Sequence, residues 1–313
     1  MVFRAVLILV VVLVAAAMIV PLVNYSRHDY ESLELGEEAR KSAPGKFVQV
    51  SYGNVHYDLK GPESGRQVVL VHGFSVPFYL WDPTFEALAA AGFRVLRYDL
   101  FGRGYSDRPP LRYDGDLFDR QLVELLEALH IKGKVDLVGA SMGGPIVVGF
   151  ACRHEERVRT VSLFDPGFSR GSQLPSKLRT PILGEYFMAV EIAPSLPASQ
   201  RDDFLHPEKF PDWPERYRPQ MQYKGFRMAL LSTLRHSLTA DWSREYTCLG
   251  GRPTPVFLVW GKHDRDVPFE VSKDVLAAIP RAEFLPVEDA GHVPFLEHPE
   301  IVEPALEKFL TGN

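Results

Sequence analysis

Strand-like and helix-like segments alternate between residues 67 and 164, and this alternation constrains the fold more than any other feature of the sequence. Residues 67–71 form a continuous aliphatic run, which is typical of a strand buried on both faces. Residues 114–130 carry leucines at helical spacing. Helices that alternate with buried strands connect parallel strands and cover both faces of their sheet. The sequence therefore predicts an α/β protein built on a mostly parallel sheet.

The alternation stops between residues 168 and 250 and then resumes. This stretch holds eight prolines and eleven aromatic residues, and it is too long for a structureless loop inside a compact domain. We expect a mostly helical insertion that lies over the sheet as a cap. The expected strands are at 47–50, 55–59, 67–71, 94–100, 135–139, 158–164, 255–260 and 283–287, and the expected helices at 84–91, 114–130, 143–153, 268–278 and 301–310.

The N-terminus begins with an apolar run, Ala5 to Val23, that contains no polar or charged side chain. As a helix this run spans about 28 Å, close to the hydrocarbon thickness of a bilayer. We expect an uncleaved single-pass membrane anchor; the alternative is a signal peptide cleaved near Ala15–Ala17, which leaves a secreted or periplasmic protein. The expected divisions are an anchor or signal peptide (1–24), a polar stalk (25–46), a first core part (47–167), the cap (168–250) and a second core part (251–313).

The charge balance and the cysteine count exclude several classes of protein. With 35 Lys+Arg against 40 Asp+Glu and a net charge of −5, the chain is not a generally basic nucleic-acid binder. Cys152 and Cys248 are too few for a disulfide-stapled scaffold; they could form one bridge, but we expect buried free thiols. The histidines lack metal-ligand spacing and the glycines form no phosphate-binding loop. The sequence predicts no metal, no cofactor and no nucleic-acid partner.

The chemistry is predicted where strands end. Residues Gly139-Ala-Ser141-Met-Gly143 match G-x-S-x-G at a strand-to-helix junction, which is the context of a nucleophile elbow. The turn is so sharp that the positions two residues from the serine must lack a Cβ atom. Ser141 would thereby stand above the carboxyl edge of the sheet, beside the N-terminus of the next helix.

A serine needs an adjacent base, and a histidine base needs an orienting acid. Asp264 follows one downstream strand and His292 follows the next, which gives the chain order Ser, Asp, His. Asp266 is a rival for the acid, and Asp165, after the strand that ends near residue 164, is another. We favour Asp264, and we expect Asp165 to open the turn into the cap.

Five motifs together resemble those of α/β-hydrolase-fold serine hydrolases, over roughly residues 47–311: His72-Gly-Phe74, the loop 99–106, the Ser141 elbow, Asp264 and His292. The resemblance implies an eight-stranded, mostly parallel sheet with a cap inserted after the sixth strand. It also implies an oxyanion hole made by the backbone N–H groups of Phe74 and Met142.

Within this family, Ser141 argues against haloalkane dehalogenases and epoxide hydrolases, which carry Asp at that position. The loop after Gly73 lacks the glycine run of HGGG-type lipases. Together with the N-terminal apolar run, the pattern most resembles membrane-associated monoacylglycerol lipase-type esterases. Carbon–carbon bond hydrolases and cofactor-free haloperoxidases share much of the pattern, and a non-catalytic binding protein on this fold is a further alternative.

The expected function is hydrolysis of a carboxylic ester, acylglycerol or similar lipid, through an acyl-enzyme, with Ser141, His292 and Asp264 as the triad. An apolar ester substrate and the membrane are the expected partners. Supporting roles in loop structure are expected for His72, Asp99, Arg103 and Ser106. Cap aromatic residues could line an acyl pocket or form cap core: Phe168, Tyr186, Phe187, Trp213 and Trp242.

Overall fold

The computed structural model describes residues 2–313 and contains one eight-stranded sheet. The strand order is β1-β2-β4-β3-β5-β6-β7-β8; β1 and β2 pair antiparallel, as do β2 and β4, and the other pairs are parallel. The predicted fold class is therefore confirmed. The strands are β1 (Lys46–Val50), β2 (Gly53–Lys60), β3 (Gln67–Val71), β4 (Arg94–Tyr98), β5 (Val135–Ala140), β6 (Val158–Phe164), β7 (Val256–Gly261) and β8 (Glu283–Val287).

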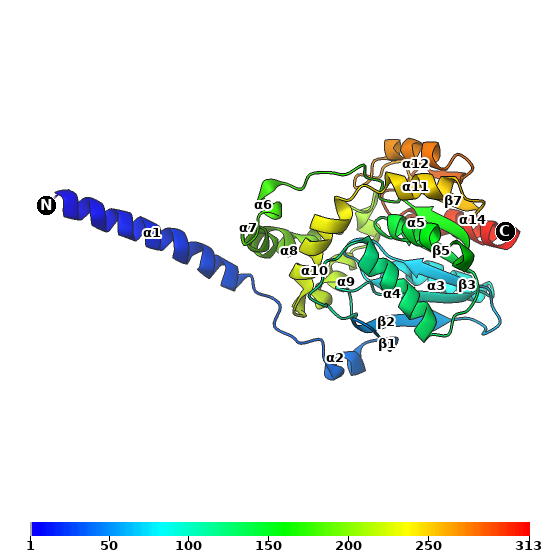
Figure 1. Cartoon of the computed structure of the whole chain (residues 1–313), viewed down its shortest axis with the longest axis horizontal. Coiled ribbons are helices and arrows are strands. Elements are labelled where there is room, and N and C mark those ends of the chain that lie inside the picture. The colour runs from blue at the N-terminus through cyan, green and yellow to red at the C-terminus, as the bar shows by residue number, and fades with distance from the viewer. Residues whose placement is uncertain (1) are drawn as a thin grey trace.

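Helices cover both faces of the sheet, because successive side chains of a strand point to opposite faces. Val69 and Val71 of β3 belong to the hydrophobic cluster under α4, α5, α11 and α12, whereas Val68 and Leu70 belong to the cluster under α3 and α14. Figure 1 shows these helices around the strands. They are α3 (Asp82–Ala90), α4 (Gly115–Ala128), α5 (Gly143–Arg153), α11 (Ser243–Gly250), α12 (Ser272–Ala278), α13 (Pro294–Glu297) and α14 (Pro299–Gly312), with short helices η1 (Phe78–Trp81), η2 (Glu155–Arg157) and η7 (Phe269–Val271).

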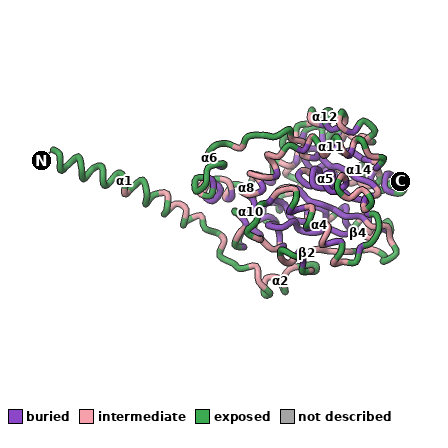
Figure 2. Tube along the Cα trace, viewed as in Figure 1, coloured by how far each residue is buried: buried purple, intermediate pink, exposed green. Residues whose placement is uncertain are grey.

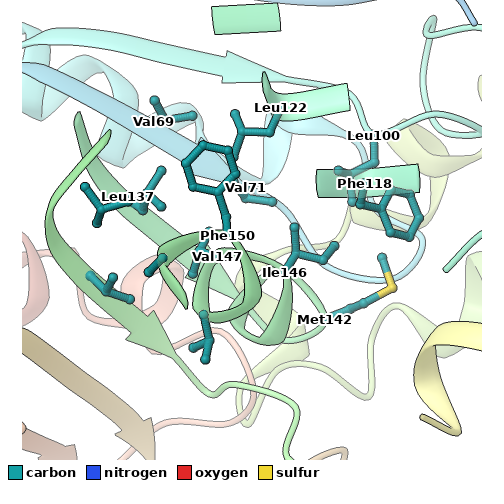
Figure 3. Close-up of a cluster of buried hydrophobic side chains, with 14 of the residues drawn as sticks. Val69, Val71, Leu100, Phe118, Leu122, Leu137, Met142, Ile146, Val147 and Phe150 are labelled. Carbon is teal, nitrogen blue, oxygen red and sulfur yellow. The ribbon is translucent and has the colours of Figure 1, made fainter. Parts of the chain in front are cut away.

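The core beneath the elbow is densely packed. Figure 3 shows Ile146, Val147 and Phe150 of α5 against side chains of β3, β5 and α4. The side chain of Met142 points into the same cluster and is 1% exposed. Burial of Met142 fixes the residue that follows Ser141, so the elbow is anchored on its core side.

Short helices fill the region between β6 and β7, as expected for an inserted cap. They are α6 (Ser176–Arg179), α7 (Leu183–Phe187), η3 (Met188–Ile192), α8 (Ala193–Ser199), η4 (Pro207–Lys209), α9 (Trp213–Tyr217), η5 (Arg218–Gln222), α10 (Phe226–Thr233) and η6 (Leu234–Leu238). The helix that follows them, α11, lies against α5 and α12 on the sheet. The boundaries assigned to the cap, 168 and 250, stay a prediction.

The apolar run forms one long helix, α1 (Val2–Arg27), that projects from the rest of the molecule; Met1 lies outside the described residues. None of its residues is buried, and Figure 2 shows it mostly exposed, with a few intermediate positions, among them Asn24 and Tyr25. By length and hydropathy this helix could cross a membrane, and a signal sequence would meet the same criteria. A short helix, α2 (Glu37–Ser42), lies between α1 and β1.

The expectation of free buried thiols is wrong in this structure. Cys152 of α5 and Cys248 of α11 form a disulfide across 96 residues of sequence, and both are only partly buried. The two helices pack side by side, which brings together cysteines that no sequence spacing connects. The bridge therefore joins the elbow helix to the helix through which the chain returns from the cap.

Candidate active site

Ser141 occupies the strained turn between β5 and α5. Its φ is +51°, a value that non-glycine residues rarely adopt. A Cβ atom at Gly139 would lie 2.4 Å from the Gly143 carbonyl oxygen, and one at Gly143 would lie 2.2 Å from the Val71 carbonyl oxygen. Both glycines are therefore required by close backbone approach, as the sequence predicted. The Ser141 N–H also donates to the Phe164 carbonyl oxygen at 2.9 Å, which ties the elbow to β6.

Asp264 and His292 form a buried pair after β7 and β8. The His292 Nδ1 lies 2.7 Å from Asp264 Oδ2. Asp264 Oδ1 accepts the backbone N–H groups of Asp266 at 2.8 Å and Val267 at 2.9 Å. One carboxylate oxygen thus fixes the loop, while the other orients the imidazole so that its Nε2 remains free for the serine side. Asp266 contributes its backbone to this arrangement, not its carboxylate.

The pKa of His292 is set by opposed effects. Burial lowers the pKa of His292, but the Asp264 carboxylate, through charge and a hydrogen bond, outweighs burial and raises that pKa above its ordinary value. An imidazole with a raised pKa is a stronger base. Only the neutral ring can accept the Ser141 proton, so the raised pKa also moves the pH at which His292 acts as a base upward.

Asp165 lies directly behind this pair. It is fully buried at the end of β6, its φ is +44°, and its Oδ1 accepts the Gly261 N–H at 2.8 Å. Burial raises the pKa of Asp165 well above its ordinary value, and the Asp264 carboxylate raises it further. Burial and the Asp264 carboxylate thus both favour the protonated form of Asp165. The structure places both candidate acids near His292, but only Asp264 hydrogen-bonds to it.

Asp165, Asp264 and His292 each offer an atom within 4.8 Å of the others, which is close enough for the three to be considered as metal ligands. The Nδ1 of His292 is already paired with Asp264, and Asp264 Oδ1 is occupied by two backbone N–H groups. The raised pKa of Asp165 also disfavours the deprotonated form that a metal ligand needs. We interpret the cluster as an acid–base system.

The loop after β3 approaches Ser141 closely. A Cβ atom at Gly73 would lie 3.1 Å from the Ser141 Cβ. The Phe74 carbonyl oxygen accepts a hydrogen bond from Arg103 Nε at 2.7 Å, so the Phe74 peptide is held in place. Within residues 2–313, neither the Phe74 N–H nor the Met142 N–H finds a hydrogen-bond acceptor. Both N–H groups remain available as donors, as an oxyanion hole requires.

The residues expected to support these loops do so. His72 accepts the Leu100 N–H at Nε2 (2.9 Å), and its Nδ1 lies 2.9 Å from the Gly73 carbonyl oxygen; burial lowers the pKa of His72 to about 4, so the ring is neutral. Asp99 accepts the Phe78 N–H at 2.7 Å. Ser106 donates to the Asp99 carbonyl oxygen at 2.6 Å.

Ser141 lines two cavities. The first, of about 200 Å³, is lined by Ser141, His292 and the Gly73–Val76 loop, and from the cap by Leu196, Ser199, Gln200, Asp202 and Asp203. The second, of about 280 Å³, is lined by Ser141 and mainly apolar residues that include Phe168, Leu238, Trp242 and Val271. Two of the cap aromatics singled out in the sequence, Phe168 and Trp242, thus line a cavity at Ser141. Trp213 is buried in the cap core, and neither cavity includes Tyr186 or Phe187.

The sequence did not point to Asp203, although this cap residue contacts the site. Its carbonyl oxygen accepts the His292 N–H at 2.7 Å, and its side chain lines the first cavity. Desolvation raises the pKa of Asp203 well above its ordinary value, against the opposite effect of His292. No periodicity or motif marks a lone aspartate in an irregular segment, so no local signal could have found it.

The comparison with protein families places this site in a known context. Residues 68–305 match the alpha/beta hydrolase family, and the chain belongs to that family. A 2-hydroxy-6-oxononadienedioate/2-hydroxy-6-oxononatrienedioate hydrolase of Paraburkholderia xenovorans is 27% identical over 296 residues, which cover 87% of this chain and 96% of that protein.

Solved structures show the same fold. A thermophilic esterase from Thermogutta terrifontis has a TM-score of 0.72 at 24% identity, with 86% of this chain and 99% of that chain covered. A membrane phospholipase A described as a bacterial virulence factor has a TM-score of 0.69 at 21% identity, with 99% of this chain and 97% of that chain covered. Hydrolases and esterases are thus among the structural neighbours.

Proposed function

We propose that this chain is a membrane-anchored serine hydrolase that cleaves carboxylic esters of lipids. The observation that carries the proposal is the meeting of Ser141, on its strained elbow, with the His292–Asp264 pair in one cavity. A strained backbone is retained where the surrounding structure enforces it, and such positions cluster at active sites. The free N–H groups of Phe74 and Met142 lie on the two loops that flank Ser141.

The proposed reaction follows from these groups. His292 Nε2 takes the proton of Ser141 as Oγ attacks the ester carbonyl carbon, and the Phe74 and Met142 N–H groups stabilise the oxyanion. The tetrahedral intermediate collapses, His292 returns the proton to the leaving alcohol, and an acyl-enzyme remains. His292 then takes a proton from water as the water attacks the acyl carbon, and it gives this proton to Ser141 Oγ as the bond from Oγ to the acyl carbon breaks and the carboxylic acid leaves. Asp264 stabilises the imidazolium in both halves.

The two cavities suggest how an ester would bind. The cavity beside Phe168 and Trp242 is mainly apolar and suits an acyl chain. The cavity beside Asp202 and Asp203 has hydroxyl, amide and carboxyl side chains on its cap side and suits a polar, uncharged alcohol part. This arrangement favours monoacylglycerols and zwitterionic lysolipids over esters with anionic head groups.

Hydrolysis of a carbon–carbon bond is the second candidate, because the relative from Paraburkholderia xenovorans is named for a dioate substrate. A dioate carries two carboxylates. Among the described residues that line the two cavities none is Lys or Arg, and three aspartates, Asp202, Asp203 and Asp266, line the first. The lack of Lys and Arg among these lining residues therefore favours a neutral ester over a dianionic substrate, which would need cationic partners.

Anchoring by α1 is part of the proposal. The similarity to the membrane phospholipase A extends over 99% of this chain, which includes the region of α1. An uncleaved anchor holds the catalytic part at the lipid surface, where lipid esters have a high effective concentration. The Cys152–Cys248 disulfide supports placement of the catalytic part on an oxidising side of the membrane.

The test combines an active-site probe with a substrate panel. The full-length chain should be labelled by a fluorophosphonate at Ser141, and the Ser141→Ala variant should not. Monoacylglycerols with acyl chains of octanoyl length or longer should give a higher kcat/KM than acetate esters. The dioate for which the relative from Paraburkholderia xenovorans is named should be hydrolysed slowly. Labelling elsewhere contradicts the serine assignment, and a preference for acetate esters contradicts the lipid assignment alone.

A further inference from the structure

Two apolar side chains stand in solvent at the corner between α6 and α7. Ile182 is 84% exposed and Leu183 is 47% exposed. The φ of Ile182 is +67°, in the left-handed region that β-branched residues avoid. Such a conformation is strained for a residue with a branched Cβ atom. The corner thus displays an isoleucine at a conformational cost, without burying it anywhere in the described chain.

This corner lies beside the end of α1. The side-chain amide of Asn24 donates to the Tyr186 hydroxyl of α7 at 3.1 Å. Asn24 is the first polar residue after the apolar run and marks the level at which α1 would leave the hydrocarbon layer. In Figure 1, α6 and α7 lie on the side of the cap that faces α1, and α1 contacts η3, which follows α7. Tyr25 and Tyr186 supply the aromatic side chains that are enriched at this level of a membrane.

The chain after α1 is fastened to the cap, so the position of the corner is fixed. Glu31 accepts the backbone N–H groups of Gly225 and Arg227, both at 2.7 Å, and the Arg227 Nε at 2.9 Å. The Leu33 N–H donates to the Gln222 carbonyl oxygen of η5, and the Leu33 carbonyl oxygen accepts the Lys224 N–H, both at 2.9 Å. Residues Glu31 to Leu33, which belong to the expected polar stalk, are therefore bound to the cap at η5 and α10. We call this contact the clamp. Because the clamp starts four residues beyond Arg27, the cap cannot swing far from the membrane end of α1.

The charges around the corner fit a lipid surface. Lys177 of α6 pairs with Glu191 at 2.5 Å, whereas Arg179 is exposed and has no ion-pair partner among the described residues. Arg27, at the end of α1, is also exposed. An apolar tip flanked by arginines is the pattern of a segment that enters the interface of a bilayer, with the cations at the head groups.

We propose that the corner Arg179–Leu183 is a second membrane contact, which dips into the same leaflet from which α1 emerges. This inference rests on the proposed anchoring by α1. Ile182 and Leu183 would enter the interfacial layer, and Arg179 would lie among the phosphates. Two contacts fix the tilt of the catalytic part, which one helix alone cannot do. The cap would then remain at the surface that supplies the ester.

The test uses the full-length chain in vesicles of phosphatidylcholine and phosphatidylglycerol. A cysteine introduced by Leu183→Cys is labelled with an environment-sensitive fluorophore, and lipids with a doxyl group on the acyl chain serve as quenchers. The control is Ile301→Cys, at a residue that is 44% exposed. It belongs to α14, which lies at the opposite end of the molecule from α1 in Figure 1. We expect the label at 183 to be quenched at least about twofold and the label at 301 to be unaffected.

A label introduced by Val14→Cys separates this inference from the anchoring. Quenching at 14 without quenching at 183 overturns the second contact and leaves the anchor intact. Absence of quenching at both positions overturns the anchor and the second contact together. If the label at 183 responds to protein density in the vesicle but not to doxyl lipids, a second copy of the chain covers the corner, and the proposal is wrong.

An activity measurement gives a second readout. The double substitution Ile182→Asp and Leu183→Asp should lower hydrolysis of a monoacylglycerol embedded in vesicles several-fold, and hydrolysis of a water-soluble ester should be unchanged. Ile301→Asp is the matched control and should change neither rate. Equal loss on both substrates would indicate a folding defect of the cap and would overturn the proposal.

Discussion

The sheet core and the cap are stabilised in different ways. The core consists of strands with buried apolar side chains and of helices up to 14 residues long, one of which, α4, has its first turn capped by Asp114 at 3.1 Å from the Leu117 N–H. The helices between β6 and β7 that precede α11 have at most eight residues, and several contain proline. Their positions depend on long-range bonds, such as that of Arg103 to Thr233 at 2.8 Å.

This difference assigns different tasks to the two regions. Every proposed catalytic side chain stands at the end of a core strand, whereas the cap supplies cavity walls and the contact with the end of α1. Substitutions in the core site should therefore abolish the chemistry while the protein stays folded. Substitutions in the cap and its clamp should change stability or substrate preference by smaller amounts.

The largest effect is expected for Ser141→Ala. The hydroxyl is proposed as the nucleophile, so its removal should lower kcat by at least about 10⁴-fold. Thermal unfolding should be unchanged or slightly improved, since alanine removes only one polar atom from the strained elbow. Steady-state rates on a monoacylglycerol and the melting temperature check this together. Retained turnover with normal folding would show that the chemistry does not depend on the elbow.

The kcat values of the Asp264→Asn and Asp165→Asn variants should differ by about two orders of magnitude or more. Asp264 holds the imidazole through a charged hydrogen bond, so its amide variant should lower kcat by about 10³-fold. The raised pKa of Asp165 favours its neutral form, and an amide in its place should lower kcat less than about tenfold. Rates for the two purified variants decide between them. The reverse order would assign the acid of the triad to the end of β6.

The next largest effect is expected on stability, from loss of the disulfide between α5 and α11, where the chain returns from the cap to the core. Replacing Cys152 and Cys248 by serine should lower the free energy of unfolding by about 2–4 kcal/mol, because the bridge constrains a long segment of the unfolded chain. The turnover rate at 25 °C should change little, since α5 keeps its packing on β5. Denaturant unfolding measures the loss. Two titratable thiols in the unreduced wild-type chain would contradict the bridge.

The pH dependence of kcat/KM follows from His292. The Asp264 carboxylate raises the pKa of His292, and only the neutral imidazole can accept the serine proton. The acid limb of the wild-type profile should therefore lie above the ordinary histidine value of about 6.5. In Asp264→Asn the largest effect that opposes burial is lost, and the limb should move at least about one unit lower. An unmoved limb would indicate that another group controls the titration.

The same contrast explains what the sequence could predict. The strands, the elbow at Ser141 and the order of Asp264 and His292 follow from periodicity and short motifs, which act over a few residues. The clamp of Glu31 on Arg227 and the Cys152–Cys248 bridge join residues 196 and 96 positions apart. No local pattern encodes such pairings, because they exist only after the cap has packed on the core. For the same reason, composition could not separate the cavity-lining Trp242 from the buried Trp213.

The smallest effect is expected in the clamp, and it tests whether the cap depends on contacts with the segment after α1. Glu31 is 11% exposed at its side chain and accepts three hydrogen bonds, so Glu31→Gln should destabilise the chain by about 1–2 kcal/mol. Glu34 is the matched control. It pairs only with Lys224 and is 73% exposed, so Glu34→Gln should cost less than about 0.5 kcal/mol.

Thermal unfolding of both detergent-solubilised full-length variants measures this difference, which should correspond to a shift of about 2–6 °C for Glu31→Gln. The melting temperature of Glu34→Gln should remain at the wild-type value. Equal shifts would mean that the clamp is an ordinary surface contact and that the cap folds without it. A shift confined to Glu31→Gln would mean that the segment after α1 is a structural part of the cap, since a loose tether would contribute nothing to its stability.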